Sequence, residues 1–279
     1  MMTMTTLPIH TLRKIIQETS PLIHNITNVV VTNFTANGLY AIGASPVMAY
    51  AEEEVEEMAK IAEALVLNIG TLTKREVHAM LLAGKAANKA GTPIILDPVG
   101  VGATSFRTET AKHLLTELNI AVIRGNAGEI ANLTDQTVEM RGVDSTAKMD
   151  NVVTVAKEVA KTWDTVVALT GETDVITDGD HVYTVDNGHF LQSKITGAGC
   201  LLSSIVGAFV AIHDDLLEAV TSAVSFYGIS AQVAAEKQPN MGPGHFQTHF
   251  LDVLYQISSE EIDHWVRIHK FNHTEGDSL

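Results

Sequence analysis

The sequence contains very little of several residue types, and each shortage excludes a class of protein. One cysteine among 279 residues, Cys200, permits no intramolecular disulfide, which suits a reducing cytoplasm. Basic residues number 18 against 33 acidic ones, so the formal charge is −15 and we expect no nucleic-acid partner. Aromatic residues make up only 5%, so small aliphatic side chains must fill the core.

Membrane, targeting and common cofactor motifs are also missing. The sequence contains no apolar run of about 18 residues, so we expect no membrane-spanning helix. The opening MMTMTTLPIH has no basic segment followed by an apolar one, so we expect no signal peptide and a cytoplasmic protein. GxxxxGK[ST] does not occur, so a Walker-type phosphate loop lacks support. HExxH does not occur either, which disfavours a zinc site of that type. No GxGxxG follows the first strand, so a dinucleotide-binding oxidoreductase also lacks support.

The sequence does contain a regular alternation of strand and helix signals. Buried-strand patterns such as ALVLNI (64–69), PIIL (93–96) and TVVAL (165–169) alternate with amphipathic segments such as 73–90. This alternation predicts an α/β fold with a parallel sheet and right-handed crossovers. Because no linker or repeat interrupts it, we expect a single domain over residues 1–279.

Two turn signals predict an antiparallel part of the sheet. Asp178-Gly179-Asp180 and Asn187-Gly188 separate three β-rich pieces, which are 174–177, 181–185 and a stretch near Phe190. We interpret residues 134–145 as a loop. The C-terminal third of the chain is predicted to be helical, with helices near 197–212, 215–236, 245–258 and 260–269.

Polar side chains follow several of the expected strands. They are Asn25, Asp97, Arg124 with Glu129, and Thr170 with Gly171. Ligands of open parallel sheets bind beyond the carboxyl ends of the strands, so these residues are candidates for a binding site. A structural interpretation stays open, because Asn25 and Asn28 could be helix caps and Glu129 lies three residues after a possible cap.

A glycine-rich turn, Thr196 to Gly199, precedes an uncharged apolar helix that starts near Cys200. Amides at the start of such a helix, from Gly197, Ala198, Gly199 and Cys200, would form an anion hole. The helix end should also lower the pKa of the Cys200 thiol and favour the thiolate. An anion hole beside a potential base indicates phosphoryl transfer to a hydroxyl. The alternative is a packing turn with Cys200 as a small buried residue.

Together these segments resemble the hydroxyethylthiazole kinases of the ribokinase-like superfamily. The resemblance covers about residues 10–258 and depends on HNITN (24–28), SPVMA (45–49), LDPVGVGAT (96–104), RGNAGEI (124–130), LTGE (169–172) and ITGAGC (195–200). It implies a three-layer α/β/α fold. It also implies transfer of phosphate from ATP to the alcohol of 4-methyl-5-(2-hydroxyethyl)thiazole, for thiamine phosphate salvage.

The resemblance also implies residue roles and partners. Met48, Gly197 and Asn25 would bind the thiazole, Arg124 and Thr170 the nucleotide, and Asp97 and Glu129 magnesium through its waters. Cys200 stands where many ribokinase-like kinases have Asp, so it would act as the base. Family members are similar in forming homotrimers with active sites between subunits.

Two other functions remain as alternatives to the thiazole kinase. A related kinase of a vitamin precursor, such as a hydroxymethylpyrimidine, is disfavoured by HNITN together with Met48. A non-catalytic thiazole-binding trimer is disfavoured by the presence of Asp97, Glu129 and Arg124. Substrate competition and ATP-consumption assays would discriminate them.

Overall fold

One ten-stranded sheet forms the centre of the computed structural model, which describes residues 2–134, 145–237 and 240–271. Its parallel part contains, in spatial order, β7 (Val166–Thr170), β6 (Val122–Asn126), β5 (Ile94–Asp97), β4 (Ala64–Asn68), β2 (Leu22–Ile26) and β3 (Ser45–Val47). Beyond β7 the sheet continues antiparallel through β8 (Asp174–Thr177), β9 (Val182–Val185), β10 (Ile268–Phe271) and β1 (Met2–Met4). The predicted α/β fold, mainly parallel with an antiparallel edge, is confirmed.

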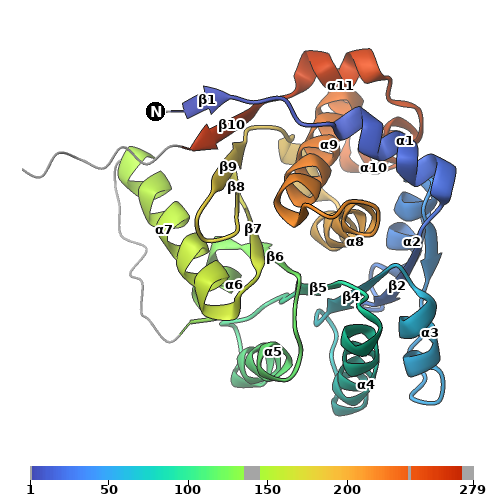
Figure 1. The fold of residues 1–279 in the computed structure, drawn as a ribbon. Helices are drawn as coiled ribbons and strands as arrows, with labels where there is room; N and C mark the ends of the chain where they lie inside the picture. Colours follow the sequence, from blue (N-terminus) through green and yellow to red (C-terminus); the bar gives the residue numbers. More distant parts are fainter. Residues whose placement is uncertain (1, 135–144, 238–239, 272–279) are drawn as a thin grey trace, which may run out of the picture.

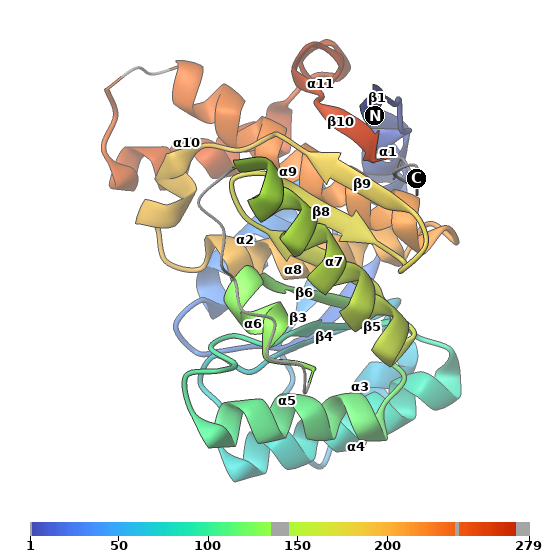
Figure 2. The same ribbon diagram turned by 90° about the vertical axis from the view of Figure 1, so that its left-hand side faces the viewer.

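The central strands are apolar on both faces, which explains why helices cover the sheet from both sides. Every residue of β4 and β5 is buried. Such runs of Val, Ile and Leu are typical of parallel strands that are enclosed between two helical layers. Figure 2 shows the resulting three layers, with the sheet between two groups of helices.

The first helical layer encloses the most apolar helix of the chain. It contains α1 (Ile9–Thr19), α2 (Thr32–Ile42), α8 (Ala198–Val210), α9 (Leu216–Lys237), α10 (Pro243–Gln256) and α11 (Ser259–Trp265) (Figure 1). Helix α8 lies directly on β2, β4 and β5, and all residues from Leu201 to Val210 are buried. Because α8 is fixed so firmly, its first turn has a defined position above the strand ends.

The second helical layer covers the opposite face. It contains α3 (Val55–Ile61), α4 (Lys74–Ala90), α5 (Ser105–Glu117) and α7 (Ser145–Trp163), with the short α6 (Ala127–Ala131) directly after β6. A full capping box of Thr73 and Glu76 starts α4, and Gly91 ends it in the left-handed region, so the helix agrees with the amphipathic segment expected at 73–90.

Several predicted boundaries are wrong near the antiparallel edge. The stretch near Phe190 is no strand but a 3₁₀ turn, η1 (Phe190–Lys194), and Asn187-Gly188 does not form a hairpin. The buried Asn187 side chain instead donates to Gln232 Oε1 and to the carbonyl of Trp265, at 2.7 and 2.8 Å. These distant contacts decide the local backbone, so turn propensity is overridden.

The end of the chain also differs from its prediction. Residues 260–269 were expected to be helical, but α11 stops at Trp265 and β10 pairs antiparallel with β9, Ile268 opposite Val185. The first strand, β1, then pairs with β10. Most of the predicted loop at 134–145 lies outside the described residues.

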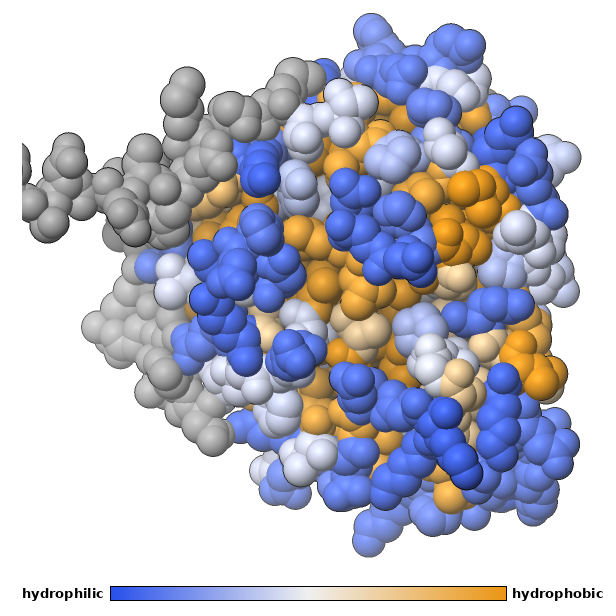
Figure 3. All heavy atoms as spheres, in the orientation of Figure 1, coloured by the Kyte–Doolittle hydropathy of each residue, from blue (hydrophilic) through white to orange (hydrophobic). Residues whose placement is uncertain are grey.

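The described helices include none that is long and apolar enough to cross a membrane. On the face shown in Figure 3, hydrophilic residues dominate the rim, and apolar residues are visible between them. The most exposed large apolar side chains of the described residues include Val29 and Val30, each 65% exposed, which directly follow the HNITN segment.

Candidate active site

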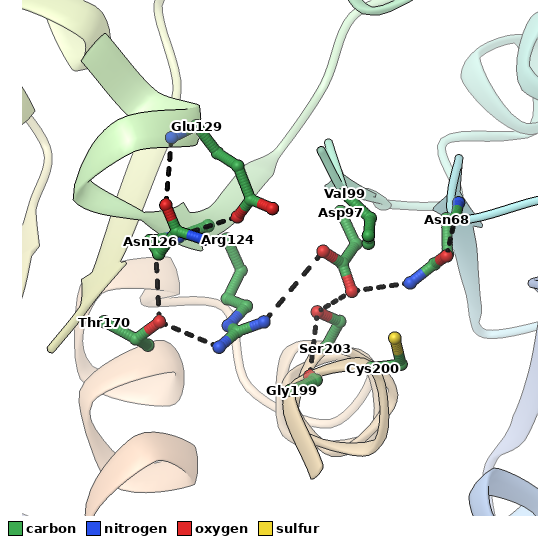
Figure 4. A network of polar contacts seen from close by, with 12 residues as sticks. Asn68, Asp97, Val99, Arg124, Asn126, Glu129, Thr170, Gly199, Cys200 and Ser203 are labelled. Carbon is green, nitrogen blue, oxygen red and sulfur yellow. Dashed lines mark hydrogen bonds and ion pairs between the residues drawn. The ribbon is translucent and has the colours of Figure 1, made fainter. Parts of the chain in front are cut away.

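The carboxyl ends of the parallel strands meet the start of α8 at one edge of the sheet. Asp97 ends β5, Arg124 lies in β6 and Thr170 ends β7, and parallel pairing brings these strand ends side by side. Figure 4 shows the three side chains around the first turn of α8, where Gly199 and Cys200 lie. The predicted gathering of Asp97, Arg124, Thr170 and the glycine-rich turn is therefore found in the structure.

Two glycines, Gly197 and Gly199, allow the backbone at the start of α8 to lie close to neighbouring side chains. Gly197 has φ +87°, and a Cβ there would lie 2.6 Å from Val31 Cγ1. Gly199 leaves room for Arg124, because a Cβ there would lie 2.7 Å from Arg124 Nη1. No side chain caps the helix, so the first amides of α8 are not covered by a capping group. This is the arrangement that an anion hole requires.

Arg124 links Thr170 to the carboxylate of Asp97. Its Nη2 donates to Thr170 Oγ1 at 2.8 Å, and its Nη1 lies 3.9 Å from Asp97 Oδ1. Thr170 Oγ1 in turn donates to the carbonyl of Gly125, at 3.3 Å. The guanidinium is thereby held over the start of α8 and adds a positive charge to the helix end.

Asp97 is a completely buried carboxylate with one oxygen available. Its Oδ2 accepts hydrogen bonds from Asn68 Nδ2 at 2.7 Å and from Ser203 Oγ at 2.8 Å, whereas Oδ1 has no hydrogen-bond partner. Burial raises the pKa of Asp97 to about 6, although Arg124 opposes this. The group is still mainly ionised at neutral pH, and its free oxygen suits a cation.

Glu129 is held by backbone amides from two strand exits. Its Oε1 accepts from Gly100 N at 2.8 Å and its Oε2 from Asn126 N at 2.9 Å. The side chain of Asn126 accepts a hydrogen bond from Glu129 N. Asn126 and Glu129, three residues apart, therefore form a complete capping box at the start of α6. Glu129 therefore joins the loop after β5 to the end of β6, opposite Asp97 (Figure 4).

The expected thiolate character of Cys200 is wrong for this structure. Burial raises the pKa of the thiol to about 11, and the charge of Asp97 adds to the increase. Hydrogen bonds from Asn68 and Asn28 and the charge of Arg124 act in the opposite direction but do not compensate. The loss of hydration thus outweighs the helix end, and the group is mainly a neutral thiol at neutral pH.

Of the predicted substrate residues, Asn25 is buried and Met48 is partly exposed. Asn25 is completely buried beneath α8, where its Nδ2 donates to the carbonyl of Ile23 and its Oδ1 accepts from Ser204 Oγ at 2.7 Å. Its amide is therefore not free to bind a ligand. Met48 follows β3 and is partly exposed, in a segment anchored by a hydrogen bond between His24 Nε2 and the carbonyl of Ala49.

A pocket of about 660 Å³ extends from Arg124, Thr170 and Gly199 toward the antiparallel edge. Its wall also contains Asp174, Phe190 and Tyr227, none of which sequence reasoning had singled out as site residues. The Asp174 carboxylate accepts the Gly171 amide at 2.9 Å. The pocket is large enough for a bound small molecule and opens directly beside the first turn of α8.

Sequence reasoning missed two polar residues around Asp97 and Cys200, Asn68 and Ser203, and considered Asn28 only as a possible helix cap, whereas its side chain donates to Asn68 Oδ1 and Cys200 Sγ. One signal could have found Asn68, which ends the clean strand ALVLN and pairs in register with Asp97. Ser203 could have been found from helical spacing, because it lies one turn after Gly199 on α8.

The carboxylates of Asp97 and Glu129 are compatible with a magnesium ion whose remaining ligands are phosphate oxygens and waters. Among the described residues, no group of three or more His, Cys, Asp or Glu side chains could hold a metal ion. Asp97 offers an unpartnered buried oxygen, and Glu129 is fixed opposite it. Mg²⁺ commonly binds through one or two carboxylates together with phosphate oxygens and waters, so these residues fit that ion.

The three-layer arrangement of this chain is a ribokinase-like fold. A ribokinase-like superfamily protein from Enterococcus faecalis has a TM-score of 0.61 at 12% identity, covering 84% of this chain and 86% of that one. Pyridoxal kinase from Staphylococcus aureus, in complex with AMP-PCP and pyridoxal, has a TM-score of 0.54 at 17% identity, covering 74% and 85%. These two likenesses concern the fold alone.

A family model for hydroxyethylthiazole kinases matches residues 12–260. A hydroxyethylthiazole kinase protein from Pyrococcus horikoshii is 40% identical, with a TM-score of 0.86, and the match covers 95% of this chain and 99% of that one. The chain therefore belongs to the hydroxyethylthiazole kinase family and is a kinase.

Proposed function

We propose that this kinase transfers the γ-phosphoryl group of ATP to the hydroxyethyl alcohol of 4-methyl-5-(2-hydroxyethyl)thiazole. The product would be the thiazole phosphate used in thiamine phosphate salvage. Family membership supports the substrate. The observation that carries the chemistry is the convergence of the uncapped start of α8, Arg124 and Asp97 at one edge of the sheet. Residues 1–279 would act as one domain in the cytoplasm.

The nucleotide would occupy the pocket beside α8, with Arg124 and Thr170 as its contacts. Both side chains line the pocket, and the amides of Gly197, Ala198, Gly199 and Cys200 would surround the transferred phosphoryl group. Charge spreads over the phosphoryl oxygens in the transition state, so fixed donors and a guanidinium are the main source of rate acceleration.

Asp97 and Glu129 would hold Mg²⁺, largely through its water molecules. The ion would neutralise charge on the nucleotide phosphates when it is bound. The protein's own contribution would be to keep Asp97 Oδ1 without a hydrogen-bond partner, 3.9 Å from Arg124, whose side chain lines the pocket.

Cys200 would accept the proton of the alcohol. As the alcohol oxygen bonds to γ-phosphorus, the bond from γ-phosphorus to the bridging oxygen of ADP breaks, and the alcohol proton passes to the sulfur of the ionised, thiolate form of Cys200, which becomes the neutral thiol. A thiol with a pKa of about 11 is rarely ionised at neutral pH, so its contribution as a base is modest. A loose transition state needs little help from a base, which makes this combination workable.

The thiazole would bind between Gly197 and Met48, close to the boundary of a second subunit. Asn25 would support this region from below, through Ser204 on α8. Val29 and Val30 expose apolar surface beside the site, and such surface favours a protein interface. We therefore propose a homotrimer with active sites between subunits.

The decisive experiment measures ADP release and phosphate transfer to the thiazole alcohol, with and without Mg²⁺. We expect transfer that depends on both the alcohol and the metal. A hydroxymethylpyrimidine offered in competition tests the related kinase: preferential phosphorylation of the pyrimidine would replace the proposed substrate. Binding of the thiazole without any ATP consumption would indicate a non-catalytic protein.

A further inference from the structure

Two buried side-chain amides connect the sulfur of Cys200 to the carboxylate of Asp97. Asn28, which follows β2, is 6% exposed, and Asn68, at the end of β4, is 2% exposed. Asn28 Nδ2 lies 3.3 Å from Cys200 Sγ and donates to Asn68 Oδ1 at 2.9 Å. Asn68 Nδ2 then donates to Asp97 Oδ2 at 2.7 Å. Asn68, Asp97 and Cys200 are seen side by side in Figure 4.

The direction of this chain is fixed by the groups at its centre. Asn68 Oδ1 accepts two donors, Asn28 Nδ2 and the Gly70 amide, both at 2.9 Å. An oxygen that accepts both must point away from Asp97, so the Asn68 amide nitrogen must face the carboxylate. Asn28 therefore presents an N–H group to Cys200 Sγ, and Asn68 presents one to Asp97 Oδ2.

The surrounding backbone is built to keep Asn28 in place. A Cβ on Gly70 would lie 2.7 Å from Asn28 Nδ2, so the amide occupies space that only a glycine leaves open. Arg107, from α5, fixes this backbone by donating to the carbonyls of Ile69 and Gly70, at 2.8 and 2.7 Å, and to that of Val99, at 2.6 Å. Val99 lies two residues after Asp97, so one guanidinium holds both strand exits.

We infer that Asn28 and Asn68 are positioning residues for phosphoryl transfer, whose amides hold the Cys200 sulfur and the Asp97 carboxylate in a fixed relation beside the start of α8. This inference rests on the proposed kinase function. The two residues act through Cys200 and Asp97, so their loss changes the rate of the chemical step more than the binding of ATP.

The test compares Asn28→Leu, Asn68→Leu and their double variant with the parent enzyme. Each single variant should lower kcat by about 10–100-fold, with KM for ATP within about threefold. The double variant should be about as slow as the slower single variant, because the two amides belong to one chain. Gly70→Ala should reproduce the effect of Asn28→Leu and add little to it.

Asn88→Leu is the matched control. Asn88 also bonds through its side-chain amide, to the backbone of Asn119 at 2.8 Å, but it lies before the amino end of β5. Its loss should lower the melting temperature and leave kcat unchanged. Folded Asn28→Leu and Asn68→Leu variants with kcat within about twofold of the parent, or a double variant with multiplied losses, would overturn the inference.

A second measurement needs no substrate. The chain has one cysteine, so the rate of iodoacetamide alkylation reports on Cys200 alone. Asn28→Leu removes an N–H donor from the sulfur and should slow alkylation several-fold, whereas Asn88→Leu should not. An unchanged rate in Asn28→Leu contradicts the contact itself. If the parent enzyme transfers no phosphate to the thiazole alcohol, the proposed function fails, while this measurement still tests the amide chain.

Discussion

At the scale of single residues, the site combines two groups whose ionisation is opposed by burial. Asp97 and Cys200 both have raised pKa values, because each loses hydration between α8 and the strand ends. Asp97 remains ionised at neutral pH and Cys200 remains protonated. In the proposed mechanism, the charged groups are therefore in place before substrate binds, and Cys200 would be a weak proton acceptor.

Replacing Cys200 with Asp should keep or raise turnover at neutral pH, because a carboxylate there is ionised more readily than a thiol. The parent activity should rise with pH between about 7 and 10, whereas Cys200→Asp should vary less in that range. The nearby Asp97 charge should make the variant less stable. Steady-state rates across pH and a melting curve check both statements; a folded, assembled variant without activity would contradict the role of the base.

Asp97→Asn should abolish phosphoryl transfer and yet stabilise the fold at neutral pH. The pKa of the buried carboxyl, raised from 3.8 to about 6, means that the folded state holds the extra proton between these values. Stability of the parent therefore falls as pH rises through about 4 to 6. We expect the variant to gain about 3 kcal/mol above that range, with the gain disappearing below it.

Urea unfolding of Asp97→Asn at several pH values measures this gain. Glu117→Gln serves as the control, because hydrogen bonding to Lys85 lowers the pKa of that exposed carboxylate. The control should give no gain at neutral pH. A stability difference for Asp97→Asn that does not change with pH would contradict the linkage.

At the scale of secondary-structure elements, the proposed anion hole depends on the start of α8. Gly197 must be in the left-handed region and in contact with Val31 of the segment before α2, while Gly199 must leave space for Arg124. These two contacts set the distance from the helix amides to the strand ends. The position of the anion hole therefore depends on α2 and β6 as well as on α8 itself.

Gly197→Ala should reduce kcat at least tenfold, because the added Cβ meets Val31 and displaces the first turn of α8. Gly91→Ala is the matched control: Gly91 has a similar φ of +79°, but a Cβ there meets nothing within 4 Å. Both variants should lose about 1 kcal/mol from the left-handed backbone, and only Gly197→Ala should lose activity. Equal activity in the two variants would contradict the proposed anion hole.

At the scale of the whole molecule, exposed apolar side chains lie beside the candidate site, where the proposed trimer would need an interface. Val29 and Val30 are exposed immediately after Asn28, which takes part in the amide chain at the site. A partner that covers them would also close the substrate side of the site. The proposed trimer thus links association to substrate binding.

Val30→Asp should dissociate the proposed trimer and raise KM for the thiazole alcohol by more than tenfold, because a charge would be buried at the interface. Sedimentation velocity gives the mass directly. Ile61→Asp is the control, since Ile61 is also 65% exposed but lies at the end of α3. A Val30→Asp protein that keeps the parent mass would place the interface elsewhere.

The sequence alone determined the alternation of elements and the residues at the strand exits. Local patterns predict β4, β5 and β7 because buried parallel strands are continuous apolar runs, and Thr73 and Gly91 mark the ends of α4 because capping is a local interaction. The segment resemblance likewise anticipated the family.

Only the tertiary structure decided the features that depend on contacts between distant segments. The pairing of β10 with β9, the turn at Asn187, the burial of Asn25 and the raised pKa of Cys200 all come from neighbours far away in the chain. Pairing, hydration and the direction of a buried amide are set by what surrounds a residue in space, and local propensity contains no information about those surroundings.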